Sequence, residues 1–290
     1  MMPPLSQPPA DGGVVRFKQI TKCFDGLVAV DHADLELAEG EFFGFLGPNG
    51  AGKSTTIKMA TGLLKPTSGR VLVFGMDPYE RPLEVKALIG VVPEEVPLYE
   101  RLTGREALEF AGRLHLLDPR TARSRADGLI EWLDLQDAAS ALIVDYSTGM
   151  KKKVALGCAL IHRPRLLFLD EPFSGIDPVA VKGIKDVLSQ MVREGVTVFF
   201  SSHVMELAER LCTRVAIIHK GRIRAAGTLP EVRSAAGLGD GASLEDVFMQ
   251  VVGGHTDVAG AEWLIAEGAG KSREAETASQ RNNGSTIQRE

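Results

Sequence analysis

One segment of the sequence has the residue types and the spacing of a loop that binds phosphate groups. Residues 47–54 match the pattern G-x-x-x-x-G-K-[ST] in full. Glycines let the backbone bend around a phosphate, and the helix that follows adds the positive end of its dipole. Lys53 supplies a cation for the β- and γ-phosphates, and the Ser54 hydroxyl is a ligand for Mg²⁺. The predicted nucleotide-binding residues here are Gly47, Pro48, Asn49, Gly50, Ala51, Gly52, Lys53, Ser54 and Thr55.

Two neighbouring carboxylates later in the chain supply the chemistry that such a site also requires. Asp170 and Glu171 directly follow an apolar run over 166–169. One carboxylate in this position holds Mg²⁺ through its water shell, and the other orients and polarises the water that attacks the terminal phosphate. Alone, the pair is equally typical of two carboxylates that end a strand. Together with the phosphate loop, it predicts Asp170 at the metal and Glu171 as the catalytic carboxylate.

The elements that must position these residues follow from the hydrophobic pattern. Residues 42–46 form a short apolar run directly before the phosphate loop, which is typical of a strand buried on both faces. Further runs of this kind occupy 166–169, 196–200 and 215–218. Because helical stretches alternate with these runs, the pattern predicts a parallel core sheet with helices on its faces. Near residues 15–17 and 33–37 apolar and polar residues alternate, as in antiparallel strands with one buried face.

Between Thr103 and about Pro164, helical patterns follow one another without strands. Thr103 and Glu106 have the spacing of a capping box, and Leu108, Ala111 and Leu114 follow at helical spacing. Further helices are expected over 122–135 and directly after Ser147, and a last amphipathic stretch covers 244–252.

The chain is therefore predicted to be an α/β P-loop NTPase cassette with a parallel core sheet, an antiparallel β subdomain and an inserted helical subdomain. The cassette covers 14–230, with the helical subdomain at about 95–164, and a helical extension covers 231–252. The proline-containing stretch 1–13 is expected to be a flexible arm. Residues 253–290 are expected to be a disordered tail, because their few large apolar residues cannot offset the entropy of ordering.

Composition excludes several classes of protein. The net charge of −5 over 290 residues argues against a general nucleic-acid coat, which needs excess basic charge. The sparse cysteines, Cys23, Cys158 and Cys212, have no metal-ligand spacing and are typical of reduced thiols in a cytosolic protein. No apolar run approaches the roughly 18 residues that span a bilayer, and the N-terminus does not have the pattern of a secretory signal. We therefore expect any role at a membrane to require a partner.

Further motifs give the chain a family resemblance. Residues 146–150 read Tyr-Ser-Thr-Gly-Met, residues 174–177 read Ser-Gly-Ile-Asp, and His203 follows the apolar run 196–200. With the phosphate loop and the carboxylate pair, this ordered set resembles the nucleotide-binding subunit of an ATP-binding cassette (ABC) transporter over about 14–252. The resemblance is closest to the single-cassette subunits of bacterial multidrug-type export systems.

The resemblance implies roles for particular residues. Ser147 and Gly149 belong to a signature that closes over ATP held by a second copy, and Asp177 contacts the phosphate loop of that copy. His203 is implied to hydrogen-bond the γ-phosphate and to hold the water of Glu171 in line, and Phe24 to stack on adenine, although a core position for Phe24 is as typical. Independently, Ser147 and Gly149 open a helix, whose N–H groups and dipole favour an anion. Lys151, Lys152 and Lys153 follow directly, and for each of them a solvated basic face is the more typical position.

One position departs from the family pattern. After residues 89–93 the family normally has Gln, whereas this chain has Glu94 and then Glu95. A carboxylate can ligate Mg²⁺, but it donates no hydrogen bond and it repels the γ-phosphate. We therefore predict Glu94 as a metal ligand, with altered coupling and rate.

The resemblance implies an ATP-hydrolysing subunit that uses Mg²⁺, dimerises head to tail with a second copy and powers a separate integral membrane permease, with export favoured over import. It would lie in the cytoplasm, peripheral on the inner face of the membrane, and bind no nucleic acid. One alternative is a soluble cassette ATPase without a transport role, although Tyr146 follows Lys53 by only 93 positions, which leaves no room for a long inserted coiled coil. Another is a regulatory nucleotide-binding module with little turnover, which Glu94 leaves open.

Overall fold

The computed structural model describes residues 13–176 and 178–253. Apart from Gly13 and Gly253, the predicted arm and tail lie outside these residues, and so does Asp177. The strands are β1 (Val15–Phe24), β2 (Leu27–Leu37), β3 (Phe42–Leu46), β4 (Ser68–Val73), β5 (Ile89–Val92), β6 (Leu166–Asp170), β7 (Thr197–Ser202), β8 (Arg214–His219) and β9 (Arg222–Thr228). The helices are α1 (Lys53–Ala60), α2 (Pro82–Leu88), α3 (Gly104–Leu114), α4 (Pro119–Trp132), α5 (Thr148–Leu160), α6 (Pro178–Arg193), α7 (Met205–Leu211), α8 (Leu229–Ala235) and α9 (Leu244–Val252), with short 3₁₀ turns η1 (Gln136–Ala138) and η2 (Ile143–Asp145).

A six-stranded sheet in the order β5-β6-β7-β3-β8-β9 forms the centre of the cassette. All its pairings are parallel except that of β8 with β9. The apolar runs predicted as buried strands are β3, β6, β7 and β8, so the predicted parallel core is confirmed. The edge strands β5 and β9 were not predicted. β5 has only four residues and directly follows α2, and β9 reads Arg-Ile-Arg-Ala-Ala-Gly-Thr, with a single large apolar residue, so neither carries a strong strand pattern.

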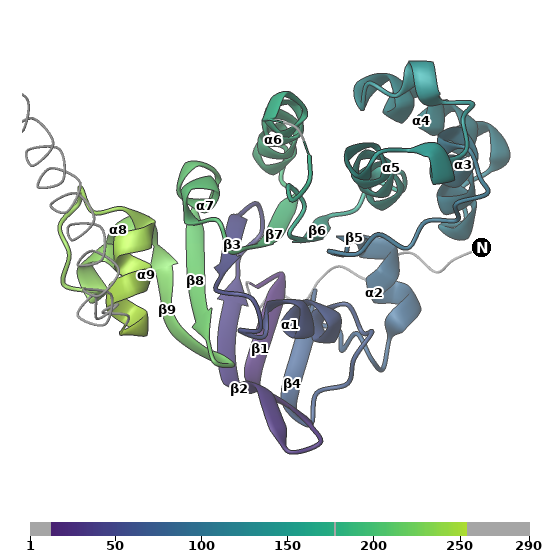
Figure 1. Ribbon diagram of the computed structural model, residues 1–290. Coiled ribbons are helices and arrows are strands. Elements are labelled where there is room, and N and C mark those ends of the chain that lie inside the picture. The colour runs from purple at the N-terminus through teal and green to yellow at the C-terminus, as the bar shows by residue number, and fades with distance from the viewer. Residues whose placement is uncertain (1–12, 177, 254–290) are drawn as a thin grey trace, which may run out of the picture. The chain divides into compact units, whose positions relative to one another are not determined.

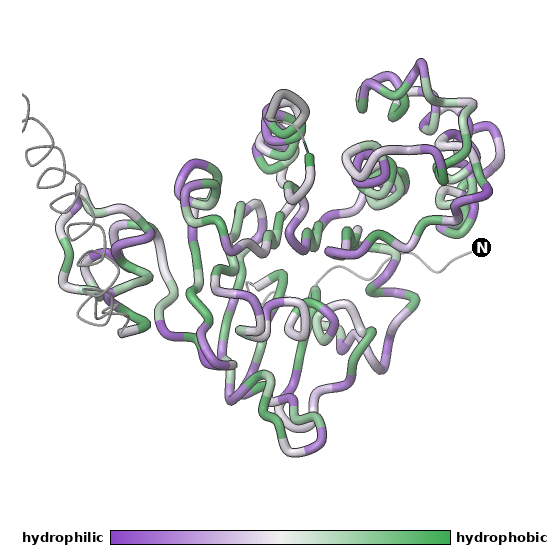
Figure 2. The backbone as a smooth tube through the Cα atoms, in the orientation of Figure 1, coloured by the Kyte–Doolittle hydropathy of each residue, from purple (hydrophilic) through white to green (hydrophobic). Residues whose placement is uncertain are grey.

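Both faces of this sheet are covered. Phe42 and Leu46 of β3 belong to one hydrophobic cluster, and Phe43 and Phe45 to the other. Figure 1 shows α5, α6 and α7 on one side of the sheet and α1 on the other. In Figure 2, β8 is mainly hydrophobic, whereas hydrophobic and hydrophilic residues alternate along the helices. Burial on both faces is the reason for the continuously apolar strands.

The antiparallel subdomain is a three-stranded sheet in the order β2-β1-β4. Leu35 and Leu37 of β2 are buried and Glu36 between them is exposed, as the alternation predicts. β4 was not predicted, since its first half, Ser-Gly-Arg, is polar and exposed.

The helical subdomain begins as predicted but differs in detail. Thr103 caps α3, and both reciprocal hydrogen bonds of the capping box with Glu106 are present. Leu114 of the predicted apolar stripe is 66% exposed, because it lies at the end of α3. α4 starts three residues before the predicted 122, since Asp118 caps it ahead of Pro119, and it ends at Trp132 instead of 135. Within the described ranges, no helix is long and apolar enough to cross a membrane.

The order of the strands determines where the chemistry gathers. β6, β7 and β3 are consecutive neighbours and run parallel, so their carboxyl ends meet at one edge of the sheet. The phosphate loop, the carboxylate pair and His203 follow these three ends. This edge is where open α/β sheets bind their ligands.

Candidate functional site

The phosphate loop joins the end of β3 to the start of α1, and its shape requires glycine. Gly52, the N-cap of α1, has φ +108°. A Cβ there would lie 2.5 Å from the carbonyl oxygen of Ala29, and a Cβ on Gly47 would lie 2.3 Å from that of Ile218. Side chains at these two positions would push the loop away from the sheet. The glycines therefore keep the N–H groups at the start of α1 open to an anion.

A cavity of about 360 Å³ opens at this loop. It falls within the usual range for sites that bind small molecules. Its lining comprises Ala29, Asn49, Gly50, Gly52, Lys53, Ser54, Thr55, Glu94 and Glu171. The structure thus brings most of the phosphate-loop residues together with Glu94 and Glu171.

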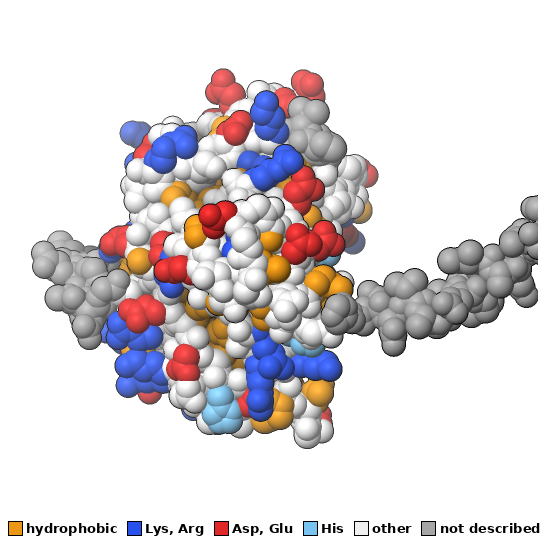
Figure 3. Space-filling view, turned by 90° about the vertical axis from the view of Figure 1, so that its left-hand side faces the viewer, with side chains coloured by type: hydrophobic (Ala, Val, Ile, Leu, Met, Phe, Trp, Pro, Cys, Tyr) orange, Lys and Arg blue, Asp and Glu red, His pale blue; other side chains and the backbone are white. Residues whose placement is uncertain are grey.

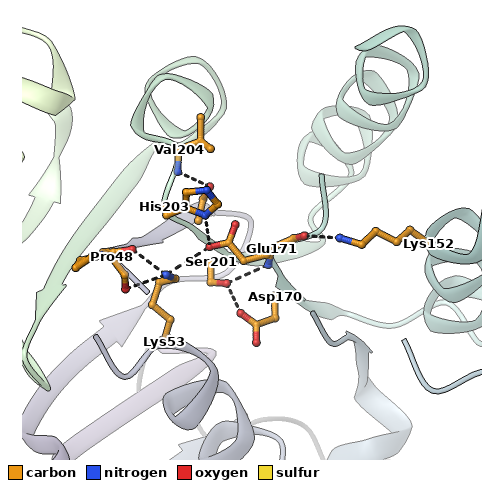
Figure 4. Close-up of polar contacts among 10 residues, drawn as sticks. Pro48, Lys53, Lys152, Asp170, Glu171, Ser201, His203 and Val204 are labelled. Carbon is orange, nitrogen blue, oxygen red and sulfur yellow. Dashed lines mark hydrogen bonds and ion pairs between the residues drawn. The ribbon is translucent and has the colours of Figure 1, made fainter. Parts of the chain in front are cut away.

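Lys53 lies buried at the centre of this site, with 5% of its surface exposed. Its Nζ donates hydrogen bonds to the carbonyl oxygens of Gly47 (2.7 Å) and Pro48 (3.2 Å) and lies 3.4 Å from Oε1 of Glu171 (Figure 4). The remaining predicted loop residue, Ala51, is buried in the turn and donates its N–H to Pro48. The ammonium group is therefore held at the cavity by contacts that an arriving phosphate would compete for.

Glu171 has the geometry of a reactive carboxylate. Its Oε1 lies 2.9 Å from Nδ1 of His203, whose side chain is 48% exposed, while the Glu171 side chain is 7% exposed. Among the described residues, no hydrogen-bond donor is aligned on this oxygen. Its backbone has φ +47°, an uncommon conformation for a non-glycine residue that costs about 1–3 kcal/mol and is concentrated at functional sites. The oxygen is buried beside the nitrogen atoms of His203 and Lys53.

Ser201, which the sequence analysis did not single out, links the two carboxylates. Its Oγ donates to Oδ1 of Asp170 and accepts from the N–H of Glu171 at 3.2 Å. The carbonyl oxygen of Ser201 also accepts from the Glu171 N–H, at 3.3 Å. Ser201 and Ser202 end an otherwise apolar strand, and this polar ending is the signal that could have identified the residue.

The residues predicted to hold Mg²⁺ fit that ion only when the phosphates of a bound nucleotide supply further ligands. Ser54 and Glu94 line the cavity, and Asp170 is buried at the end of β6, beside Glu171. In the described part of the chain, no three His, Cys, Asp or Glu side chains form a group that could hold a metal ion. Mg²⁺ is usually bound by one or two carboxylates plus substrate phosphates and water, so an oxygen set of this kind is suitable.

The signature residues lie away from this cavity. Ser147 caps α5, and its Oγ accepts from the N–H of Met150 at 3.2 Å. Gly149, in the first turn of α5, lies beside the backbone of Gly175 and Ile176. Neither Ser147 nor Gly149 lines the cavity of Lys53.

Phe24 also lies outside the cavity lining. It ends β1, is 42% exposed, and has Nζ of Lys22 5.0 Å from its ring centroid. A core position for this ring is therefore wrong.

The strand, phosphate loop and helix, with carboxylates on the neighbouring strand, define a P-loop nucleotide-binding protein. A family model described as "ABC transporter" matches residues 30–174. The linearmycin resistance ATP-binding protein LnrL of Bacillus subtilis (strain 168) is 39% identical, over 77% of this chain and 72% of LnrL. The chain belongs to the ABC transporter family.

Further comparisons agree. The "Probable multidrug ABC transporter ATP-binding protein YbhF" of Escherichia coli (strain K12) is 36% identical over 82% of this chain, but the match spans only 42% of YbhF. A solved structure titled "Structure of ATP binding subunit of ABC transporter" superposes with a TM-score of 0.78 at 31% identity, over 82% of this chain and 99% of that one. The predicted family, α/β cassette fold and ATPase class are confirmed.

Proposed function

We propose that the chain is the ATP-binding and ATP-hydrolysing subunit of a transporter, and that it powers a separate membrane-spanning permease. The observation that carries this proposal is the placement of Glu171, whose Oε1 lies 2.9 Å from His203 and 3.4 Å from Lys53 on the wall of one cavity. Lys53 and the N-terminus of α1 bind the phosphates. Glu171 accepts a proton from the water that attacks the γ-phosphorus, and His203 holds Glu171 and the γ-phosphate in line. The bond to the β-phosphate oxygen breaks, which leaves ADP and inorganic phosphate.

Mg²⁺ bound with the nucleotide would neutralise charge that develops on the phosphates. Ser54 would hold it directly and Asp170 through water, and Glu94, which lines the same cavity as Ser54, would be a further ligand. The hydrogen bond from Ser201 fixes the orientation of the Asp170 carboxylate. Phe24, exposed at the end of β1, would stack on the adenine ring, with the Lys22 ammonium displaced from its face.

The site requires a second copy of the chain. Ser147 and Gly149 open α5 but do not line the cavity of Lys53, so they are available to contact a nucleotide held by another copy. Asp177 would contact the phosphate loop of that copy. A structure titled as a dimer, the bacterial ABC transporter cassette MJ0796, superposes with a TM-score of 0.70 at 26% identity, over 74% of this chain and 98% of that one, and it supports the head-to-tail dimer.

Relatives support the transport role. One is the daunorubicin/doxorubicin resistance ATP-binding protein DrrA of Streptomyces peucetius, which is 39% identical over 75% of this chain and 66% of DrrA. By analogy, the permease would be an exporter, and the cassette would lie in the cytoplasm on the inner face of the membrane. On the face shown in Figure 3, basic and acidic side chains are intermixed, which gives no support for nucleic-acid binding there.

Mg²⁺-dependent ATP hydrolysis by the purified chain, followed as phosphate release, tests the enzymatic part. Fractionation of the native cells tests the transport part. We expect the chain to sediment with membranes and to be released by alkaline washing. A chain that hydrolyses ATP but sediments with ribosomes would support the soluble alternative. A chain that binds ATP without turnover would support the regulatory one.

A further inference from the structure

Lys152 lies in the interior, so its predicted position on a solvated basic face is wrong. It belongs to the second turn of α5, the helix that Ser147 caps, and only 7% of its surface is exposed. Its Nζ donates a hydrogen bond of 3.0 Å to the main-chain carbonyl oxygen of Glu171 (Figure 4). A buried ammonium group is rare unless it is paired, so this contact requires a reason.

The hydrogen bond from Lys152 holds the main-chain carbonyl group of Glu171, whose N–H group is held by Ser201. The N–H of Glu171 donates to Ser201 of β7, and its carbonyl oxygen accepts from Lys152 of α5 at 3.0 Å and from the N–H of Ser174 at 3.3 Å. Both main-chain polar groups of a residue with φ +47° are thus held from two different elements. A non-glycine residue keeps such a conformation only when its surroundings over-determine it.

Burial lowers the pKa of the Lys152 ammonium group, and the carboxylates of Glu171, Glu94 and Asp170 oppose that shift. Among the described residues, the buried Lys side chains are Lys53 and Lys152. Lys53 lines the cavity, whereas Nζ of Lys152 is bound to the main chain of Glu171. Lys152 therefore acts on the Glu171 carboxylate through the backbone.

We propose that Lys152 is a positioning residue for ATP hydrolysis: it fixes the backbone of Glu171 from the signature helix. This inference rests on the proposed ATPase function. It predicts that displacement of α5, which carries the signature, is transmitted to the hydrolytic carboxylate through a single hydrogen bond.

The experiment compares Lys152→Met with Lys151→Met, which removes the same charge one residue earlier and breaks only a surface ion pair with Glu100. We expect Lys152→Met, which has no donor, to lower kcat by about 30-fold and to change the Kd for a fluorescent ATP analogue by less than about three-fold, since the binding loop is untouched. Lys151→Met should keep wild-type values. Lys152→Arg retains a charged donor and should restore most of kcat. Equal kcat values for Lys152→Met and Lys151→Met would overturn the proposal.

Thermal unfolding without nucleotide tests the structural role of Lys152 independently of ATPase activity. Lys152→Met should lower the melting temperature more than Lys151→Met, because it removes the shorter of the two hydrogen bonds to the carbonyl oxygen of Glu171 and leaves only that from the N–H of Ser174. Equal melting temperatures would overturn the structural role, even if the wild-type protein proved to have no ATPase activity. Absence of wild-type hydrolysis would instead overturn the proposed function.

Discussion

Replacement of Glu171 by Gln should separate ATP binding from ATP hydrolysis. The amide keeps the size of the side chain but cannot accept a proton from water. Loss of a positioned general base typically costs about 10²–10⁴-fold in rate, or about 2.7–5.4 kcal/mol of transition-state stabilisation. We therefore expect kcat to fall by at least about 100-fold.

The same substitution should tighten ATP binding. Oε1 of Glu171 lies 3.4 Å from Nζ of Lys53. At an effective dielectric constant of about 20, their attraction is about 5 kcal/mol, and the phosphates must compete with it. If the loss of the Glu171 charge frees about a quarter of that attraction for nucleotide binding, the Kd for ATP falls by about ten-fold, which corresponds to about 1.4 kcal/mol of binding free energy. Bound but unhydrolysed ATP should then hold two copies together.

Three measurements check this prediction: phosphate release for kcat, fluorescent-nucleotide titration for Kd, and light scattering with size-exclusion chromatography for the dimer with Mg·ATP. Glu95→Gln is the matched control, since Glu95 is an exposed carboxylate that does not line the cavity. Hydrolysis at the wild-type rate by Glu171→Gln would refute the role of Glu171. Weaker ATP binding would refute the competition for Lys53.

Lys53→Ala should abolish ATP binding, and undiminished affinity in the same titration would show that the phosphate loop is not the site. Glu94→Gln should raise basal turnover about two- to three-fold by removing a charge that repels the γ-phosphate, and superimposable Mg²⁺ titrations of the two proteins would show that Glu94 does not act at the metal. Deletion of residues 254–290 should leave ATPase activity and melting temperature unchanged, and loss of either would show that this segment is needed. Burial in an apolar cavity lowers the pKa of His162 to about 4, so the unfolded chain binds the extra proton as the pH falls below about 6.5. The contribution of His162 to the free energy of unfolding should therefore decrease by about 1–2 kcal/mol as the pH is lowered from 7 to 5. Urea unfolding of the His162→Gln variant should lack that decrease.

The sequence alone was sufficient for the phosphate loop, the buried strands and the capped helices. The loop carries its chemistry in consecutive residues, so its pattern identifies it without knowledge of the fold. The capping box of Thr103 and Glu106 and the run over 42–46 depend on neighbours within a few residues. The edge strands β4, β5 and β9 were missed because a strand at an edge, or one of four residues, has too little buried surface to impose a pattern.

The contacts of Glu171 depended on the tertiary structure. Ser201 reaches Glu171 across 30 residues of sequence, and Lys152 reaches it across 19. These contacts exist because β7 lies between β6 and β3, and because α5 packs with its second turn towards the end of β6. Strand order and helix placement result from the packing of both faces of the sheet, which no local pattern encodes. For this reason the lysine run after the signature was expected on a solvated face, whereas folding buries Lys152 against the main chain of Glu171.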